Sequence, residues 1–271
     1  QNFSAVSAAC LLVKNTIFHQ VGGFDDVEFP HLFADVDFCL KVKCQALNVI
    51  WTPTVTLRHH GAKDIAETNN VKRDDLAKQG RQFLHHHIND CANDFAYNKN
   101  LSFINQDASI NLWLNVKWPT FPSNRPKIMG ITLDPWGCAE WRMAMPLRVL
   151  DKSSSAHIKF LQHGGEDDRI IQAPYATDII RSNPDVLYMQ TYIHDMHLEM
   201  IELYKKHCNT RLVYTLDDNL FELPEKNPTS NLVYPDIDER IEKVVNFCDR
   251  LIVSTEPLVD VYKGLIDDIV V

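Results

Sequence analysis

Residues 21–63 read VGGFDDVEFPHLFADVDFCLKVKCQALNVIWTPTVTLRHHGAK, and this segment decides the fold of the first part of the chain. A Gly-Gly turn precedes a helical pattern over residues 35–47, whose apolar positions recur at helical spacing: Val36, Cys39, Leu40, Val42 and Ala46. Residues 49–51 and 55–58 have the composition of short strands separated by Pro53, and two adjacent histidines follow. The segment therefore predicts a turn, an amphipathic helix and two strands, in that order.

The flanking residues extend this pattern in both directions. Upstream, residues 5–13 form an apolar run of strand length. Asn15 can cap a short helix that runs to Gln20, and Gly22 can supply the left-handed residue that ends it. Downstream, residues 70–91 predict a long helix. Three consecutive histidines on it could bind a metal, but we favour a solvated polar face for them: His85, His86 and His87.

A Pro-rich segment, residues 113–126, separates the first block from a second one and indicates a linker. The second block alternates strands with helices, which predicts βαβ units and a doubly wound parallel sheet. The predicted strands are residues 127–133, 156–161, 186–190, 211–215, 250–254 and 269–271. The predicted helices are residues 139–150, 176–181, 194–207, 237–247 and 258–265. We expect a first domain over residues 1–110, a linker over 111–126 and a second domain over 127–271.

Composition excludes several classes of protein. Hydrophobic residues make up 45% and charged residues 23% of the chain, as in ordinary globular domains. The net charge of −9 argues against nucleic acid as a partner. No apolar run approaches the roughly 20 residues needed to span a bilayer. The seven cysteines lack CxxC spacing and indicate reduced thiols in a cytosolic protein.

In order and spacing, residues 21–63 resemble the second half of a family 2 nucleotide-sugar glycosyltransferase, whose fold is called GT-A. Residues 90–101, DCANDFAYNKNL, are similar to the end of O-antigen-type members, although Phe95-Ala96 replaces a proline. The resemblance implies that Asp35 is the catalytic base, because Ala34-Asp35-Val36-Asp37-Phe38-Cys39-Leu40-Lys41 matches the family's helix. The alternative is that Asp35 only caps the helix, which is common and contributes about 1 kcal/mol.

The resemblance also implies a divalent ion, Mn²⁺ or Mg²⁺, in the first half. His59 lies where the family places its metal-binding histidine. His60 is the competing candidate, because adjacent residues on a strand face opposite sides. Asp35 and Asp37 cannot close on one ion, since residues two apart on a helix point about 200° apart. We therefore expect Asp37 to be a solvated acid of the first turn.

The turn at Gly22, Gly23 and Asp25 is implied to lie next to the acceptor site, although a helix C-cap alone also explains the glycines. The family's opening strands, which bind the donor, would lie before Gln1.

From residue 126 onward the chain is similar to the N-terminal domain of a family 4 glycosyltransferase of the two-Rossmann (GT-B) kind. The motifs are DPWGCAEWR (residues 134–142), YTLDDNLF (214–221) and VSTEPL (253–258). The resemblance implies that substrate binds at the carboxyl ends of the strands and that this half of the chain uses no cofactor. The domain that grips the donor in that family would begin after Val271.

Four residues of the second half are candidate substrate ligands. Gly137 lies between a strand and a helix, where the backbone can approach an anion, although Cys138 replaces the second glycine of the family. Arg142 could pair with a phosphate or form a surface salt bridge. Asp217 and Asp218 follow a strand end, where they could hold acceptor hydroxyls or form an Asx turn.

Together, the resemblances imply a fragment of a bifunctional glycosyltransferase. It would move a sugar from a nucleotide-sugar donor to a glycan or lipid-linked acceptor in O-antigen-like surface polysaccharide biosynthesis. The expected location is the cytoplasm, and peripheral association with the inner face of the membrane is compatible with such an acceptor. Because neither donor site is complete, the isolated chain is expected to be inactive or nearly so. Two alternatives stay open: a non-catalytic glycan-binding or scaffolding protein and, ranked last, a metal-dependent hydrolase.

Overall fold

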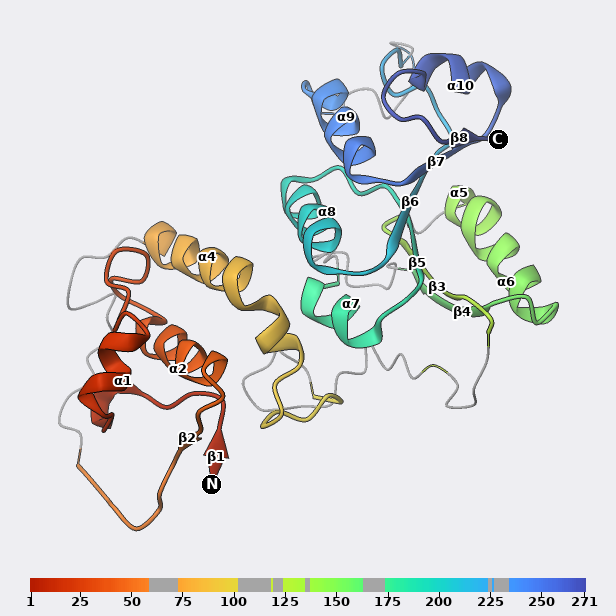
Figure 1. Ribbon diagram of the computed structural model, residues 1–271. Coiled ribbons are helices and arrows are strands. Elements are labelled where there is room, and N and C mark those ends of the chain that lie inside the picture. Colours follow the sequence, from red (N-terminus) through yellow and green to blue (C-terminus); the bar gives the residue numbers. More distant parts are fainter. Residues whose placement is uncertain are drawn as a thin grey trace. The chain divides into compact units, whose positions relative to one another are not determined.

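The computed structural model describes residues 1–58, 73–101, 118, 124–134, 137–162, 174–223, 226 and 234–271. The chain divides into two compact units, Gln1–Trp113 and Leu114–Val271 (Figure 1). None of the described helices is long and apolar enough to cross a membrane.

The first unit is built mainly from helices. They are α1 (Asn15–Gln20), α2 (Ala34–Cys44), α4 (Arg73–Ala92) and a single 3-10 turn, Ala8–Cys10. Strands β1 (Asn2–Phe3) and β2 (Val49–Ile50) form a short antiparallel pair. Two apolar clusters hold these elements together. Phe38, Cys39 and Val42 of α2 pack with Val49, and on another side of α2 Leu40 packs with Phe29 and with Phe83 of α4.

Two strands predicted in this unit are wrong. Residues 5–13 hold a 3-10 turn instead, because Ser7 Oγ accepts a hydrogen bond from Ala9 N and Asp35 Oδ2 accepts one from Ala8 N. Residues 55–58 are described but form no strand. An apolar run satisfies the pattern of a strand, yet a strand also needs a neighbour for its backbone hydrogen bonds.

The helices of this unit follow the prediction in kind and differ at their ends. The short helix begins at Asn15, so Lys14 rather than Asn15 holds the N-cap position. Gly22 has the predicted left-handed conformation, with φ +85°. Helix α2 ends at Cys44, before residue 47, and Ala46 has φ +57°.

The second unit contains a six-stranded parallel sheet, as predicted. Its strands are β3 (Lys127–Thr132), β4 (His157–Gln162), β5 (Val186–Gln190), β6 (Arg211–Leu216), β7 (Arg250–Val253) and β8 (Ile269–Val270). Their spatial order is β4-β3-β5-β6-β7-β8, so the chain reverses its direction of growth between β3 and β5. This is a Rossmann-like arrangement of the doubly wound type. The assignment of the first unit to a GT-A fold stays a prediction.

Helices cover both faces of this sheet (Figure 1). On one face a continuous helical segment consists of α5 (Gly137–Ala139), a π-helical turn (Glu140–Ala144) and α6 (Met145–Lys152). Its Met143 and Leu147 pack on Tyr188 and Val213 of the central strands. The other face carries α7 (Ala176–Ser182), α8 (Asp195–His207) and α9 (Ile237–Phe247), and α10 (Glu256–Tyr262) follows β7.

Helix α6 approaches β3 closely because position 130 is glycine. A Cβ atom there would lie 2.5 Å from Leu147 Cδ1 and 2.9 Å from Phe160 Cδ2. The absence of a side chain at Gly130 thus allows the close approach of α6 to the sheet, and α6 continues the helical segment that carries Arg142.

Candidate functional site

The first candidate site lies at the start of α2, where Asp35 joins two separate segments. Its Oδ2 accepts a hydrogen bond from Ala8 N at 3.0 Å and its Oδ1 accepts one from Val36 N at 2.9 Å. The N-cap position of α2 belongs to Phe33, at φ +69°, so Asp35 is not the helix cap. The half-buried carboxylate is therefore oriented by two backbone N–H groups.

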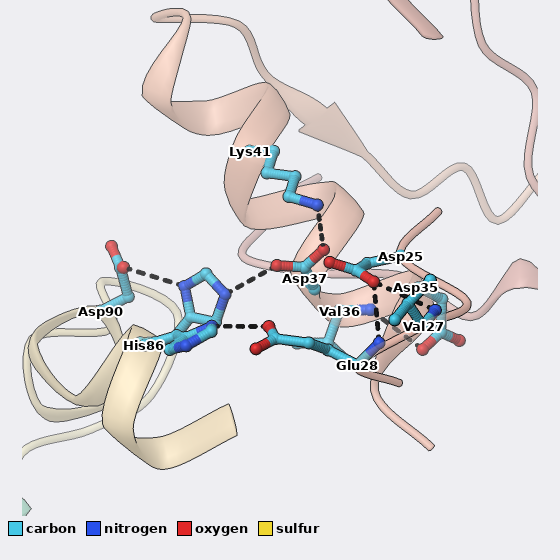
Figure 2. Close-up of polar contacts among 10 residues, drawn as sticks. Asp25, Val27, Glu28, Asp35, Val36, Asp37, Lys41, His86 and Asp90 are labelled. Atoms are coloured by element: carbon cyan, nitrogen blue, oxygen red, sulfur yellow. Dashed lines mark hydrogen bonds and ion pairs between the residues drawn. The ribbon is translucent and has the colours of Figure 1, made fainter. Parts of the chain in front are cut away.

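Asp37 is buried, with 3% of its surface exposed, so the expectation of a solvated acid is wrong. Its Oδ1 lies 2.9 Å from His87 Nε2, and its Oδ2 lies 2.6 Å from Lys41 Nζ. Figure 2 shows Asp37 between Lys41 of its own helix and one imidazole of α4, that of His87. A carboxylate removed from water needs such partners, and the packing of Phe83 against α2 brings α4 close enough to supply one.

The three consecutive histidines on α4 do not form a uniformly solvated face, contrary to the prediction. The side chain of His87 is 14% exposed, and its Nδ1 lies 3.7 Å from Asp90 Oδ2. His86 pairs with Glu28 at 3.2 Å and is far more exposed, at 46% (Figure 2). His87 is also where the helical backbone of α4 is interrupted, with φ −121° and ψ 18°.

The turn before α2 is determined by its backbone. Gly22 and Gly23 have φ +85° and +67°, and Gly23 N donates to Phe18 O at 2.9 Å. Asp25 Oδ1 accepts from Val27 N at 3.2 Å and from Glu28 N at 2.9 Å. These contacts give Asp25 a structural role in the turn, and its contact with an acceptor stays a prediction.

The residues predicted to bind a metal do not form a complete site in the described part of the chain. His59 and His60 lie outside the described residues. Among the residues that the structure does describe, no group of three or more His, Cys, Asp or Glu side chains could hold a metal ion. Of the predicted base and the predicted metal ligand, only the base, Asp35, has a described geometry.

The second candidate site lies at the carboxyl ends of the central strands in the other unit. Thr132, Gln190 and Thr215 occupy matching positions on β3, β5 and β6. All three are buried, and Thr132 Oγ1 donates to Gln190 Oε1 at 3.2 Å. A row of polar side chains at the point where strand order reverses is typical of a ligand site in open α/β sheets.

The loop after β3 brings Gly137 and Cys138 to this edge. Asp134 N donates to Thr132 Oγ1 at 3.0 Å, and Asp134 Oδ2 accepts from Ala139 N at 3.1 Å, so Asp134 links the strand to the helix. Gly137 is exposed, with open space where a side chain would lie. Cys138 is exposed, and its hydrogen bond to the Asp217 carboxylate raises its pKa to about 12.

Asp217 and Asp218 follow β6 at the same edge. Their backbone is held from behind, because Ser254 Oγ donates to Asp217 O at 2.9 Å and the Tyr262 hydroxyl donates to Asp218 O at 2.7 Å. Within the described ranges neither carboxylate accepts a backbone N–H. The Asx-type bond of this loop belongs to Asn219, whose Oδ1 accepts from Phe221 N. Burial and the charge of Asp217 raise the pKa of Asp218. The Asp217 carboxylate thus bonds only the Cys138 thiol among the described residues, and both carboxylates keep oxygen atoms that their own loop does not use.

Among the described residues Arg142 forms no ion pair, so the surface salt bridge that was its alternative role is not found there. The residue is half-buried in the π-helical turn, and its carbonyl oxygen accepts a hydrogen bond from the Tyr188 hydroxyl at 3.1 Å. Its Nε and Nη2 atoms are buried and have no hydrogen-bond partner within the described residues.

The sequence pattern did not single out Thr191, the residue that follows β5. It has φ +65°, a left-handed conformation that β-branched residues rarely adopt. Backbone strain of this kind clusters at functional sites. No feature of the sequence except its place at the end of a predicted central strand could have indicated it.

Comparison with known proteins gives limited matches. No protein-family model matches the chain. The uncharacterized protein y4gI of Sinorhizobium fredii (strain NBRC 101917 / NGR234) is 38% identical over 112 residues, which are 40% of this chain and 12% of that protein. O-antigen biosynthesis protein RfbC of Myxococcus xanthus is 33% identical over 60 residues, 22% of this chain and 5% of that protein. The chain therefore matches only a small part of the length of either curated relative and is similar, in part, to a protein of O-antigen biosynthesis.

Proposed function

We propose that this chain belongs to a glycosyltransferase of surface polysaccharide biosynthesis. It would take part in moving a sugar from a nucleotide-sugar donor to a glycan or lipid-linked acceptor. The observation that carries the proposal is the partial similarity to the O-antigen biosynthesis protein RfbC. The open parallel sheet, with polar side chains at the edge where such sheets bind ligands, is compatible with it.

In the first unit, Asp35 is the proposed general base. A base must accept the proton of the acceptor hydroxyl while that oxygen attacks the sugar, and a carboxylate oriented by neighbouring N–H groups can do so. The bonds from Ala8 N and Val36 N fix the carboxylate of Asp35 in one orientation. Asp37, paired with Lys41 and His87, would position the helix that carries Asp35.

A divalent ion, Mn²⁺ or Mg²⁺, is part of the proposal for this unit, with His59 as a ligand. Such an ion would supply positive charge for the diphosphate leaving group. Manganese affinity of the 271-residue chain, measured by titration calorimetry with Asp35→Asn as the comparison, is the direct test of this part.

In the second unit, Asp217 and Asp218 would accept hydrogen bonds from sugar hydroxyls, and Gly137 would let a substrate approach the backbone. Carboxylates whose oxygens are not used by their own loop are suited to this role. No cofactor is proposed for this unit. The proposed location is the cytoplasm, at the inner face of a membrane when the acceptor is lipid-linked.

The test of transfer compares Asp35→Asn with Asp26→Asn in the protein as it occurs in the cell. Asp26 is an exposed acid in the turn that precedes α2 and serves as a matched control. The measurement is release of nucleoside diphosphate from a panel of nucleotide-sugars. Loss of a general base is expected to lower kcat by about 10²–10⁴-fold. Equal rates for the two variants would exclude Asp35 as the base.

The second candidate function is a glycan-binding or scaffolding protein that does no chemistry. It predicts saccharide binding that is independent of Asp35 and of manganese, together with the absence of nucleoside diphosphate release from any nucleotide-sugar. Saturation-transfer NMR can measure saccharide binding by the Asp35→Asn protein, and this measurement distinguishes the binding protein from the transferase.

A further inference from the structure

An arginine side chain with an open hydrogen-bonding edge lies above the central strands of the second unit. Arg142 belongs to the π-helical turn Glu140–Ala144, which inserts an extra residue between α5 and α6. The Tyr188 hydroxyl donates to the carbonyl oxygen of Arg142 at 3.1 Å, so the turn is anchored on β5. Arg142 therefore lies over the face of the sheet on which Met143 and Leu147 pack.

The two buried nitrogen atoms of Arg142 lie on the same edge of the guanidinium group. Nε and Nη2 have parallel N–H bonds, and this edge forms the fork that binds carboxylate or phosphate through two hydrogen bonds. Neither atom has a partner in the part of the chain that the structure describes. Two buried N–H groups without a partner are costly unless something occupies them, since they have lost their hydration.

A second polar group without a partner lies nearby. Thr215 is 1% exposed and is on β6 beside Gln190 of β5, so it shares the face of Tyr188 and Val213. Its Oγ1 has no hydrogen bond of good geometry to any described residue, although it lies close enough to the Tyr188 phenol to lower the pKa of that group. Burial dominates and raises the pKa of Tyr188, while the positive charge of Arg142 lowers it. Tyr188 thus links the two groups, because its hydroxyl bonds the backbone of Arg142 and its phenol is influenced by both Thr215 and the Arg142 charge.

The carboxylates at this edge do not fill the fork. The charge of Asp217 acts on Tyr188, yet Asp217 forms its hydrogen bond with the Cys138 thiol. Asp218 lies on the same loop, and neither acid forms an ion pair with Arg142 in the described part of the chain. The edge therefore offers an anion-binding fork and, on the loop after β6, two acceptors for hydroxyl groups. An anion alone would be repelled by those acids, whereas a sugar that carries an anion would use both.

We propose that this edge binds a sugar phosphate, with the phosphoryl group on the Arg142 fork and Thr215 and the sugar hydroxyls on Asp217 and Asp218. The inference rests on the proposed function only for the choice of a sugar as the group attached to the phosphate. The phosphoryl sugar could be the glycosyl diphosphate head of a lipid-linked acceptor or part of a nucleotide-sugar donor.

Calorimetric titration of the full 271-residue chain tests the proposal, with glucose 1-phosphate, glucose, inorganic phosphate and uridine 5′-monophosphate as probes. We expect glucose 1-phosphate to bind more tightly than phosphate or glucose. Tighter binding of uridine 5′-monophosphate would assign the fork to the donor, and weaker binding would assign it to the acceptor. Absence of saturation by any phosphate probe, or equal binding of glucose and glucose 1-phosphate, would overturn the proposal.

Two variants and one control identify the fork. Arg142→Gln is expected to weaken glucose 1-phosphate binding by about 10-fold or more, the usual effect of hydrogen bonds to a charged group. Arg142→Lys keeps the charge but loses the fork, and should recover only part of the affinity. Arg148→Gln is the matched control, because Arg148 lies on the same helical segment and is exposed in a pair with Glu140. Its affinity is expected to stay within about twofold of the wild type.

Stability measurements distinguish a ligand fork from a structural arginine. If the Arg142 fork serves only to bind a ligand, Arg142→Gln leaves the Tm of the ligand-free protein unchanged or raises it. A large fall in Tm, with binding retained, would mean a structural role and would overturn the proposal. Thr215→Val keeps the shape of the side chain and should fold, so weaker binding by this variant supports the site even if Arg142→Gln does not fold. These measurements do not involve Asp35. They can therefore contradict the sugar-phosphate site while Asp35-dependent sugar transfer is still observed, and sugar transfer can be absent while the sugar-phosphate site is confirmed.

Discussion

The buried carboxylate of Asp37 meets the imidazole of His87, with 2.9 Å between Asp37 Oδ1 and His87 Nε2. The two residues are 50 positions apart and join α2 to α4. Lys41 holds the other carboxylate oxygen. The start of α2, which also carries Asp35, is therefore fixed from the side of α4 as well as by the bond between Asp35 and Ala8 N.

Replacing His87 should loosen both helices. His87→Ala leaves a buried carboxylate with one partner fewer, and we expect a loss of about 1–3 kcal/mol in the free energy of local opening. Amide hydrogen exchange of α2 and α4 measures it. His86→Ala is the control, because its pair with Glu28 is largely exposed and should contribute less than about 1 kcal/mol. Equal exchange in the two variants would contradict this role of His87.

The Gly23 turn should be sensitive to a single methyl group. Gly23→Ala places a Cβ atom 2.9 Å from Phe18 Cε1 at a residue with φ +67°, so steric overlap adds to backbone strain. We expect a loss of about 2–4 kcal/mol, measured by urea unfolding. Gly22→Ala has a similar φ of +85° but open space around it, and should cost only about 1 kcal/mol. A smaller loss for Gly23 than for Gly22 would be inconsistent with this geometry.

The Asp178 carboxyl of α7 should make stability depend on pH. Burial raises its pKa from 3.8 to about 6, against the opposing charge of Arg181. Because the folded-state pKa lies above the unfolded value, the folded protein holds the proton more tightly, and stability falls as the pH rises from about 4 to about 6. At about 1.4 kcal/mol per pKa unit, the upper bound is about 3 kcal/mol.

Asp178→Asn should therefore stabilise the protein at pH 7.5 and have little effect at pH 4. Urea unfolding at both values checks this. Asp260→Asn, a change at an exposed acid on α10, should alter stability by less than about 0.5 kcal/mol at either pH. A stabilisation by Asp178→Asn that is the same at both pH values would exclude titration as its cause.

Cys138 should react slowly although it is exposed. Its hydrogen bond to Asp217 raises its pKa to about 12, which leaves little thiolate at pH 8. Asp217→Asn should raise the rate of iodoacetamide alkylation of Cys138 by about 10-fold or more, read by peptide mass spectrometry, with exposed Cys10 as the internal reference. Asp218→Asn should have a smaller effect, because the charge of Asp218 contributes least to the shift. An unchanged rate in Asp217→Asn would mean that thiol and carboxylate do not meet.

The sequence predicted the second unit well because its signals are local. Strand β5 and helix α9 were predicted with the bounds that the structure has, Val186–Gln190 and Ile237–Phe247. Apolar runs between helical stripes suffice for a parallel sheet buried on both faces. In the first unit the same reasoning failed for residues 5–13 and 55–58, since an apolar run does not reveal whether a neighbouring strand exists.

The candidate sites were predicted less completely for the same reason. The carboxylate of Asp37 looked solvated because its partner, His87, lies 50 residues away. The position of Arg142 depends on a π-helical turn, which helical periodicity does not signal. The bonds from Ala8 to Asp35 and from Cys138 to Asp217 likewise depend on tertiary contacts that no local pattern contains.

The left-handed Thr191 after β5 has a consequence for engineering. A β-branched residue in that conformation costs about 1–3 kcal/mol, which glycine would largely recover. Thr191→Gly is therefore expected to be among the first substitutions found in a screen for a higher Tm. The same change would make the loop after Gln190 more flexible, at the point where the strand order of the sheet reverses. The more stable protein is therefore expected to bind its ligand less selectively.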